Sequence, residues 1–395
     1  MFSGSVILFD HAERNNLLPF TFTRTVSDIR IGIMTIREKW EKRLQTKTFS
    51  FTQDYLQKKF PIEIADDNLF ICGGLIPSEN EIKLFSSIKK GDAVSSDGRL
   101  IAFRVDASDA NKFLGGENLS GLSTKEISLT HRILTQKWQI FKWNDWAIEE
   151  DFQFLTSGRK SAMPSTTNTI ISPDNFFMEE GARMECTIIN ASHGKIYLGK
   201  NSEVMEGATI RGAFALCDNS EVKMQAKIYG ATTIGPHCKV GGEITNSVIF
   251  GYSNKAHDGY LGNSVIGEWC NLGADTNTSN LKNDYSDVKQ WNYASQSFEN
   301  TNQQFCGLMM GDHSKCGINS MFNTGTVVGI SANVFGDGFP RQIIPSFSWG
   351  GVGGFTDYQI NKALKVAKLV MQRRNLELTP TDIEILTHIY NLKER

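Results

Sequence analysis

The chain has 395 residues, of which 40% are hydrophobic and 21% charged, and its formal net charge is -2. This length is too great for one compact core and predicts two or three domains. The near-neutral charge excludes a broad basic field for nucleic acid or acidic membranes, and no apolar stretch approaches the roughly 20 residues of a membrane span. The seven cysteines are odd in number and lack zinc spacing, so we expect reduced thiols in a cytoplasmic protein and no bound zinc.

Residues 1–160 show strands alternating with helices, which predicts an α/β domain. The expected elements are strands at 6–9 and 69–72, helices at 31–44 and 79–88, and a hairpin over 93–105 that turns at Asp97-Gly98. A stretch rich in Ser, Thr and Lys, residues 157–168, reads as the linker to the next domain.

An aliphatic side chain then recurs at every sixth position. The repeat comprises Leu198, Val204, Ile210, Leu216, Val222, Ile228, Ile234 and Val240, and it resumes at Ile266, Leu272, Met310, Cys316, Phe322, Val328 and Val334. A period of six fits neither a helix nor a flat strand, but it fits a three-sided parallel β-helix over residues 165–350. Glycine often follows the repeated position, where we expect it to permit a tight corner. Irregular stretches at 246–262 and 274–307 must leave the coil as loops, where binding residues concentrate.

The C-terminal segment, residues 355–395, reads as a helical element. The glycine-rich run 347–354 is expected to break regular structure. An amphipathic helix is predicted over 357–374, and Thr379-Pro380 opens another. We expect these helices to form a cap or a trimer contact.

Three runs carry a resemblance to a known family. They are Lys255-Ala256-His257-Asp258-Gly259-Tyr260-Leu261-Gly262, then Val265-Ile266-Gly267 with Asn271-Leu272-Gly273-Ala274, and Asn280-Leu281-Lys282. These runs resemble the acetyltransferase domain of the GlmU family. The longer loop and the run Gly311 to Asn319 are most similar to the alternative branch found in archaea and some bacteria. The resemblance implies an N-terminal uridylyltransferase domain joined to a left-handed β-helix that acetylates glucosamine-1-phosphate with acetyl-CoA, in homotrimers whose acyl-CoA site lies between neighbouring β-helices.

The resemblance also implies roles for single residues. His257 matches the catalytic base, Tyr260 belongs to the same motif, Asn280 matches a residue near the sugar, and Ala274 matches a small residue against the acetyl-CoA arm. Histidine suits the base role because it titrates near neutral pH. Tyr229 and Thr245 stand near the places where the family has basic residues for the sugar phosphate, so we expect Lys255 or Lys282 to supply that charge. His313 lies on a regular coil and is expected to be structural.

The first domain departs from the nucleotidyltransferase pattern. No glycine-rich loop follows the first strand, Thr25-Val26 replaces a Pro-Lys pair, and Gly73-Gly74 stands where a Gly-Asp pair would hold metal. Arg24, Arg30 and Arg37 could bind nucleotide phosphates, with Mg²⁺ as a cofactor, or could instead form salt bridges. UTP and dTTP are both compatible nucleotides.

These patterns are compatible with three functions. The leading one is a cytoplasmic GlmU-like enzyme that transfers acetyl groups at the β-helix, with nucleotidyl transfer as a weaker second activity. The second is a sugar-1-phosphate nucleotidyltransferase, acting for instance on glucose-1-phosphate with dTTP, whose β-helix serves as an oligomerisation scaffold. The third is a regulator that binds sugar nucleotides without turnover.

Overall fold

The computed structural model describes residues 4–117, 119, 121–127 and 132–392. The chain forms two compact units. The N-terminal unit comprises Met1–Arg14, Thr23–Ile29 and Met34–Thr135, and the β-helix unit comprises Asn15–Phe22, Arg30–Ile33 and Gln136–Arg395. The expected boundary near residue 160 therefore differs from the structural division, since residues 136–160 belong to the β-helix unit.

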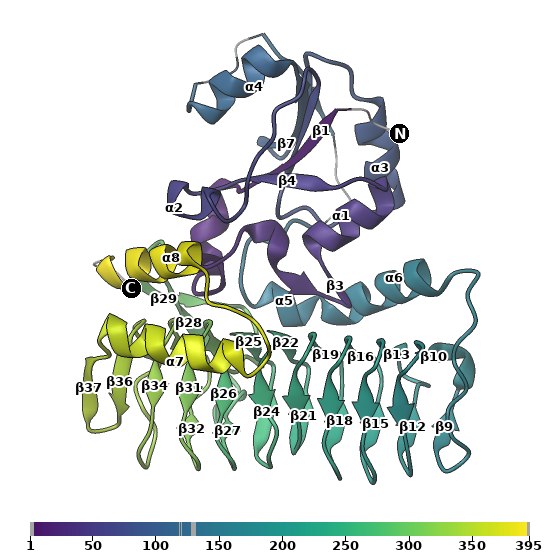
Figure 1. Ribbon diagram of the computed structural model, residues 1–395, viewed down its shortest axis with the longest axis vertical. Coiled ribbons are helices and arrows are strands. Elements are labelled where there is room, and N and C mark those ends of the chain that lie inside the picture. Colours follow the sequence, from purple (N-terminus) through teal and green to yellow (C-terminus); the bar gives the residue numbers. More distant parts are fainter. Residues whose placement is uncertain (1–3, 118, 120, 128–131, 393–395) are drawn as a thin grey trace. The chain divides into compact units, whose positions relative to one another are not determined.

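The N-terminal unit is an α/β fold around a mixed six-stranded sheet (Figure 1). In spatial order its strands are β4 (Thr48–Phe51), β1 (Ser5–Phe9), β5 (Asn68–Cys72), β7 (Arg99–Val105), β6 (Asp92–Ser96) and β8 (Ser123–Glu126). Its helices are α1 (Ile36–Leu44), α2 (Asp54–Gln57), α3 (Glu79–Ser87) and α4 (Ala107–Leu114). The first strand, β1, pairs in parallel with both β4 and β5, while β6 and β7 form the predicted hairpin. The predicted α/β class is confirmed.

The predicted helix at 31–44 begins later than expected. Residues 30–31 and 34–35 form the short strands β2 (Arg30–Ile31) and β3 (Met34–Thr35), and α1 starts at Ile36. Thr35 and Glu38 form a capping box, in which the Thr35 side chain accepts from the Glu38 N–H and the Glu38 carboxylate accepts from the Thr35 N–H. The apolar spacing predicted a longer helix because apolar periodicity alone does not show which residue caps a helix.

The β-helix unit is a parallel β-helix whose coils lie side by side in Figure 1. Its first face is β10 (Phe176–Met178), β13 (Ile196–Leu198), β16 (Phe214–Leu216), β19 (Thr232–Ile234), β22 (Val248–Gly251), β25 (Val265–Glu268), β30 (Met309–Met310), β33 (Val327–Val328) and β35 (Ile343–Ile344). Its second face is β11 (Arg183–Met184), β14 (Glu203–Val204), β17 (Glu221–Val222), β20 (Lys239–Val240), β23 (Asn254–Lys255), β26 (Asn271–Leu272), β31 (Lys315–Cys316), β34 (Asn333–Val334), β36 (Ser348–Gly351) and β37 (Gly354–Asp357). Its third face is β9 (Thr169–Ile171), β12 (Ile188–Asn190), β15 (Thr209–Arg211), β18 (Lys227–Tyr229), β21 (Glu243–Thr245) and β24 (Tyr260–Gly262), with the separate pair β27 (Asn277–Thr278) and β32 (Met321–Phe322).

The predicted sixfold repeat forms the interior of this β-helix. Leu198 pairs with Leu216, and Val204 pairs with Val222, so each aliphatic side chain stacks on its equivalent one coil away. All the repeat residues named above are buried. This confirms the prediction of a hexapeptide-repeat β-helix.

The glycines that follow the repeat have a different role from the one expected. A Cβ on Gly235 would lie 1.6 Å from the Phe250 carbonyl oxygen, and one on Gly273 would lie 2.4 Å from the Gly317 carbonyl carbon. These glycines allow the next coil to approach closely, whereas left-handed corner positions are filled by residues such as Asn219, with a φ of 58°.

Helices and hairpins surround the coils. Helices α5 (Gln139–Lys142) and α6 (Asn144–Thr156) precede the coils; Ile148 and Phe152 of α6 pack on outward apolar side chains of the first face. A hairpin of β28 (Lys289–Asn292) and β29 (Ser297–Asn300) forms within the expected 274–307 loop. Helices α7 (Ile360–Gln372) and α8 (Pro380–Asn391) close the chain, as predicted. The expectation that 347–354 breaks regular structure was wrong, because β36 pairs with both β34 and β37.

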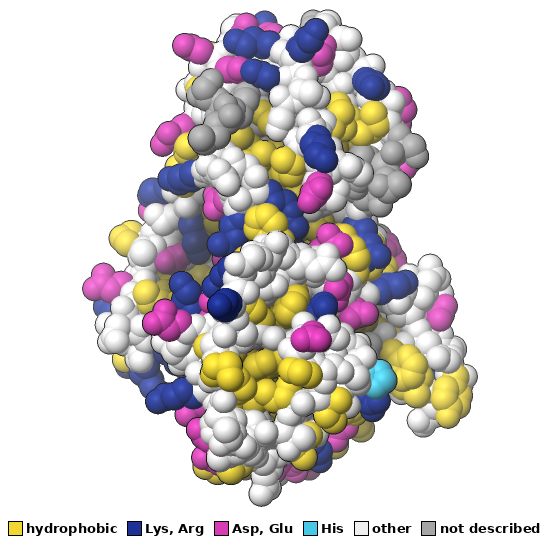
Figure 2. All heavy atoms as spheres, turned by 90° about the vertical axis from the view of Figure 1, so that its right-hand side faces the viewer, with side chains coloured by type: hydrophobic (Ala, Val, Ile, Leu, Met, Phe, Trp, Pro, Cys, Tyr) yellow, Lys and Arg dark blue, Asp and Glu magenta, His cyan; other side chains and the backbone are white. Residues whose placement is uncertain are grey.

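The surface carries charges of both signs. In the face drawn in Figure 2, Lys and Arg side chains are interspersed with Asp and Glu, in keeping with the net charge of -2. Among the described residues, no helix combines the length and the apolar character that crossing a membrane requires.

Candidate functional site

The corner between β23 and β24 carries His257 on an exposed bend. Its motif partner Tyr260 opens β24, and the Tyr260 N–H donates to Asn277 Oδ1 over 2.8 Å. The corner is joined to the following coil, since the Asp275 N–H donates to the Asp258 carbonyl over 3.0 Å. His257 is thus displayed on a corner whose backbone is tied to the next one.

Lys255 lies inside the β-helix rather than on its surface. It pairs with Val240 in an interior column of aliphatic residues, and only 1% of it is exposed. Its Nζ donates to the carbonyl oxygens of His257 over 2.7 Å and Asp258 over 3.0 Å. Burial lowers the pKa of Lys255 to about 8. The expected phosphate-binding role of Lys255 therefore needs correction, because its ammonium is buried and already bound.

Tyr260 and Asn280 meet beside this corner. Asn280 Nδ2 donates to Tyr260 Oη over 3.0 Å and to Asn263 Oδ1 over 2.8 Å. A side chain on Gly262 would collide with both groups, at 2.3 Å from Tyr260 Oη and 2.6 Å from Asn280 Nδ2. Burial raises the pKa of Tyr260, so its hydroxyl keeps its proton at neutral pH and can donate to a ligand.

Ala274 lies on the next corner along the same edge. Its carbonyl accepts from the Asn319 N–H over 2.8 Å, which links it to a third corner. A groove of about 440 Å³ opens here and is lined by Asp275, Asn277, Ile318, Asn319, Met321, Gly336 and Asp337. Ile318 is 69% exposed, so the groove offers an apolar wall to solvent. The structure therefore places His257, Tyr260, Ala274 and Asn280 on adjoining coils.

Lys282 is held by its own loop. Its Nζ donates to the Asp287 carbonyl over 2.6 Å and to Ser286 Oγ over 3.3 Å. On the third face, Tyr229 Oη donates to Glu243 Oε1 over 2.6 Å, and Glu243 pairs in register with Tyr260. Sequence reasoning missed Glu243 and Asn277, although the sixfold spacing places both on the outward side of coils next to the motif.

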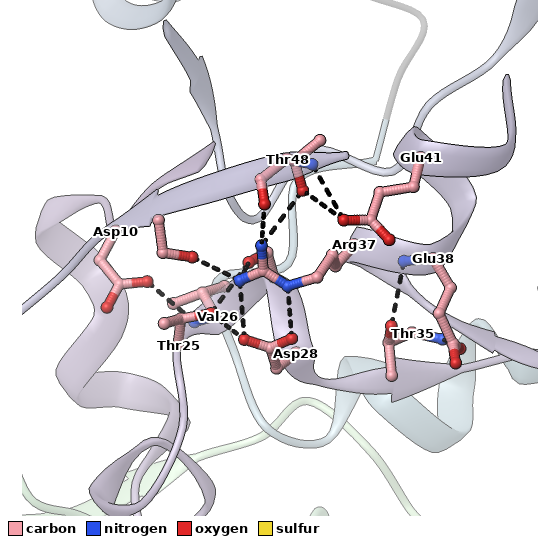
Figure 3. Close-up of polar contacts among 11 residues, drawn as sticks. Asp10, Thr25, Val26, Asp28, Thr35, Arg37, Glu38, Glu41 and Thr48 are labelled. Atoms are coloured by element: carbon pink, nitrogen blue, oxygen red, sulfur yellow. Dashed lines mark hydrogen bonds and ion pairs between the residues drawn. The ribbon is translucent and has the colours of Figure 1, made fainter. Parts of the chain in front are cut away.

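In the N-terminal unit, Arg37 binds the carboxylate of Asp28. Its Nε donates to Asp28 Oδ1 over 2.6 Å and its Nη2 to Asp28 Oδ2 over 2.9 Å, as Figure 3 shows. Nη1 donates to Thr48, whose N–H in turn donates to Glu41. Burial opposes the charged guanidinium, but the bonds to Asp28 more than offset it and raise the pKa of Arg37. Arg37 thus forms the salt bridge that was the alternative to phosphate binding.

The other two arginines of that hypothesis lie in different units. Arg24 is 5% exposed and belongs to the N-terminal unit. Arg30 belongs to the β-helix unit, where it donates to the Ile33 carbonyl and lies 3.9 Å from Cys217 Sγ. The three arginines therefore do not form one phosphate site within the N-terminal unit.

Gly74, which stands where the family pattern has a metal-binding aspartate, has no free space around it. A Cβ on Gly74 would lie 2.5 Å from His11 Nε2 and 2.9 Å from the Leu134 carbonyl oxygen, so an aspartate does not fit there. His11 bonds to that same carbonyl over 3.0 Å, and burial lowers the pKa of its imidazole. Asp10 accepts from Arg14 over 3.0 Å. Among the described residues no group of three or more His, Cys, Asp or Glu could hold a metal ion, and the position expected to supply a Mg²⁺ ligand has no room for a carboxylate.

Comparison with known proteins finds one matching family model and several similar proteins. Residues 6–160 match the family model of sugar nucleotidyl transferases. The bifunctional protein GlmU of Synechococcus elongatus is 30% identical over 203 residues, which is 46% of this chain and 41% of that protein. The GlmU proteins of Trichodesmium erythraeum (29% identity; 35% and 25% covered) and Methanocaldococcus jannaschii (39%; 22% and 21%) are also similar. The chain spans less than half the length of these relatives.

Proposed function

Because the chain is similar to GlmU proteins and matches the sugar nucleotidyl transferase model over residues 6–160, we propose that its β-helix transfers an acetyl group from acetyl-CoA to the amine of an amino-sugar phosphate resembling glucosamine-1-phosphate. The observation that carries the proposal is the exposed His257 corner, stacked through Asp258 and Asp275 on the corner of Ala274 and its groove. The motif match assigns the base and the acetyl-CoA arm to these same two corners.

His257 acts as the base of this reaction. The acceptor nitrogen attacks the thioester carbon, a C–N bond forms, the C–S bond breaks, and CoA leaves as a thiolate. The nitrogen loses one proton in this step, and an exposed imidazole at the corner is able to take it. Fixed backbone N–H groups at the corner stabilise the oxygen of the tetrahedral intermediate.

Tyr260 and Asn280 bind the acceptor sugar. The two side chains contact each other, so a sugar hydroxyl at this point meets a hydroxyl donor and an amide together. Lys282 supplies charge for the phosphate by releasing its bonds to the loop carbonyl and Ser286, since Lys255 is buried. As an ammonium, Lys282 would act as a point charge and would lack the two parallel donors of an arginine guanidinium.

Acetyl-CoA lies along the groove below Ala274, with its apolar arm against Ile318 and Met321. This groove is open, and Ile318 is largely exposed in a single chain. A neighbouring copy in a homotrimer would cover it, which a closed threefold arrangement of β-helices allows.

For the N-terminal unit we propose binding of a sugar nucleotide without turnover. The filled space at Gly74 and the paired carboxylates favour this over uridylyl or thymidylyl transfer from UTP or dTTP. Nucleotidyl transfer with the β-helix as scaffold remains the competing enzyme function. Pyrophosphate release from UTP or dTTP with a sugar-1-phosphate would establish that competitor.

The test of acetyl transfer is CoA thiol release from acetyl-CoA and glucosamine-1-phosphate. We expect His257→Ala to lower kcat by a factor on the order of 10² or more. His193→Ala removes another exposed histidine of the β-helix and serves as the matched control, with kcat unchanged. Equal activity of the two variants contradicts the base assignment, and an inactive wild-type protein contradicts acetyl transfer to this acceptor.

A further inference from the structure

The His257 corner differs from the Gln225 and Asn319 corners on the same edge of the β-helix. At those two corners an N–H bonds to the preceding coil: Gln225 N–H donates to the Glu206 carbonyl over 3.0 Å, and Asn319 N–H donates to the Ala274 carbonyl over 2.8 Å. At the His257 corner, the N–H groups of Asp258 and Gly259 donate to none of the residues that the structure describes. This corner therefore presents backbone donors that a regular coil uses internally.

Lys255 fixes the conformation in which the Asp258 and Gly259 N–H groups have no partner among the described residues. It occupies a position of the interior column that Val240 fills one coil earlier, where a lysine is unfavourable unless its ammonium is bonded. The ammonium is bonded to two consecutive carbonyls, those of His257 and Asp258. A charged group inside an apolar column breaks the pattern of the fold, and such exceptions tend to mark function.

The planarity of the peptide bond sets the direction of the N–H groups that adjoin these two carbonyls. In a trans peptide the C=O and the N–H point in opposite directions. The His257 carbonyl points inward to Lys255 Nζ, so the Asp258 N–H points outward. The Asp258 carbonyl accepts from the same Nζ and from the Asp275 N–H of the next coil, so the Gly259 N–H points away from both of these donors. Both donors thus point away from the Lys255 ammonium, at a corner where His257 is exposed.

We propose that Lys255 is a positioning residue, which holds the 256–259 corner so that the N–H groups of Asp258 and Gly259 and the imidazole of His257 face the same reacting group. The inference rests on the proposed acetyl transfer and adds to it the source of the oxyanion donors. When the amine attacks the thioester, the carbonyl oxygen gains negative charge, and two preoriented N–H groups stabilise it. The C=O bond re-forms as the C–S bond breaks, and the negative charge leaves on the CoA thiolate.

Lys255→Met tests this role because it removes the ammonium while filling the column with an apolar side chain of similar length. Replacing a buried charge by an apolar group is often neutral or stabilising, so we expect the thermal midpoint to stay or rise. We expect kcat for acetyl transfer to fall on the order of 10-fold or more, with KM for acetyl-CoA changed by less than about threefold. Lys315→Met is the matched control, since Lys315 Nζ donates to the His313 carbonyl over 2.8 Å at another corner. Its kcat should not change.

Two results would overturn the proposal. One is an unchanged kcat in Lys255→Met. The other is a fall in kcat that accompanies a fall of several degrees in the midpoint, because a purely structural lysine predicts that pattern. An inactive wild-type protein would refute the acetyl transfer instead. In that case a crystal structure of Lys255→Met decides, and carbonyls of His257 and Asp258 that still point inward would refute the positioning role.

Discussion

Asn280 Nδ2 donates to Tyr260 Oη over 3.0 Å, and this bond joins two residues that lie 20 positions apart in the sequence. Asn280 belongs to the segment that leaves the coil after β27, whereas Tyr260 opens the strand that follows the His257 corner. The start of the long loop is therefore bonded to the coil that carries His257, the proposed catalytic base. Because Asn280 positions the Tyr260 hydroxyl, a ligand that binds Tyr260 will also depend on the position of Asn280.

Tyr260→Phe should weaken binding of the acceptor. The variant keeps the ring over Gly262 but loses a hydroxyl that remains protonated at neutral pH. Loss of one hydrogen bond to the sugar should raise the acceptor KM by about three- to tenfold and leave KM for acetyl-CoA unchanged. Steady-state kinetics with each substrate varied will measure this. Tyr285→Phe, on an exposed loop residue, is the control; equal KM values for both variants would exclude Tyr260 from the acceptor site.

Gly74→Ala should destabilise the N-terminal unit. The added methyl group would lie 2.5 Å from His11 Nε2 and 2.9 Å from a backbone oxygen, and overpacking of this kind costs about 1–3 kcal/mol. Urea denaturation will give the free energy of unfolding. Gly115→Ala, where the nearest atom lies at 3.4 Å, is the matched control. If the added methyl group collides with His11, Gly74→Ala will lower the free energy of unfolding by less in a His11→Ala background. Purely additive effects of the two substitutions would refute this collision.

Lys137→Met should stabilise the protein in a pH-dependent way. Lys137 is fully buried, its Nζ has no hydrogen-bond partner among the described residues, and burial lowers its pKa from 10.5 to about 8. Below pH 8 the charged lysine opposes folding, so the variant should be more stable by on the order of 1–3 kcal/mol. Between about pH 8 and 10.5 the unfolded wild-type chain binds more protons than the folded one, so wild-type stability rises and the difference shrinks. Thermal unfolding at pH 7 and pH 10 will show it. Lys368→Met, on the exposed side of α7, should show no such trend.

Arg37→Ala should destabilise the N-terminal unit through Asp28. Removal of the guanidinium leaves the Asp28 carboxylate with a bond from Thr25 but without its cation, at a cost of about 3 kcal/mol. Arg37→Lys should recover little, because an ammonium cannot form the two parallel bonds. Hydrogen exchange over residues 25–50 will locate the effect. Lys112→Ala breaks an exposed pair with Asp109 and should change nothing; if Arg37→Ala instead lowers nucleotide affinity without changing exchange, the structural role is wrong.

The β-helix could be predicted from the sequence because its interior has a strict period. Leu198 and Leu216 stack in register, as their spacing implies, and the named repeat residues are buried. The motif around His257 could be found for a related reason: a coil that departs from the repeat stands out against regular neighbours. Placement of Tyr260 beside Asn280 needed the structure, because loops have no period that would fix their contacts.

Other features could not be read from the spacing. A helical pattern at 31–44 did not reveal that Thr35 caps α1, which moved the start to Ile36. Lys255 was expected at the surface because a lysine is usually solvated, and only the register with Val240 shows it in the interior column. The two interpretations of Arg37 could not be separated for the same reason, since sequence alone does not say whether Asp28 or a phosphate will bind its guanidinium.

The register between coils also limits how this scaffold can change length. Leu198 pairs with Leu216, and Val204 with Val222, at a spacing of 18 residues, whereas Val240 and Lys255 are in register at a spacing of 15 because the corners between them are shorter. A single inserted residue within a strand would turn every later side chain of that strand inside out. Evolution and protein engineers can therefore add or remove whole coils, or lengthen and shorten the corners, but cannot change the length of a strand by one residue.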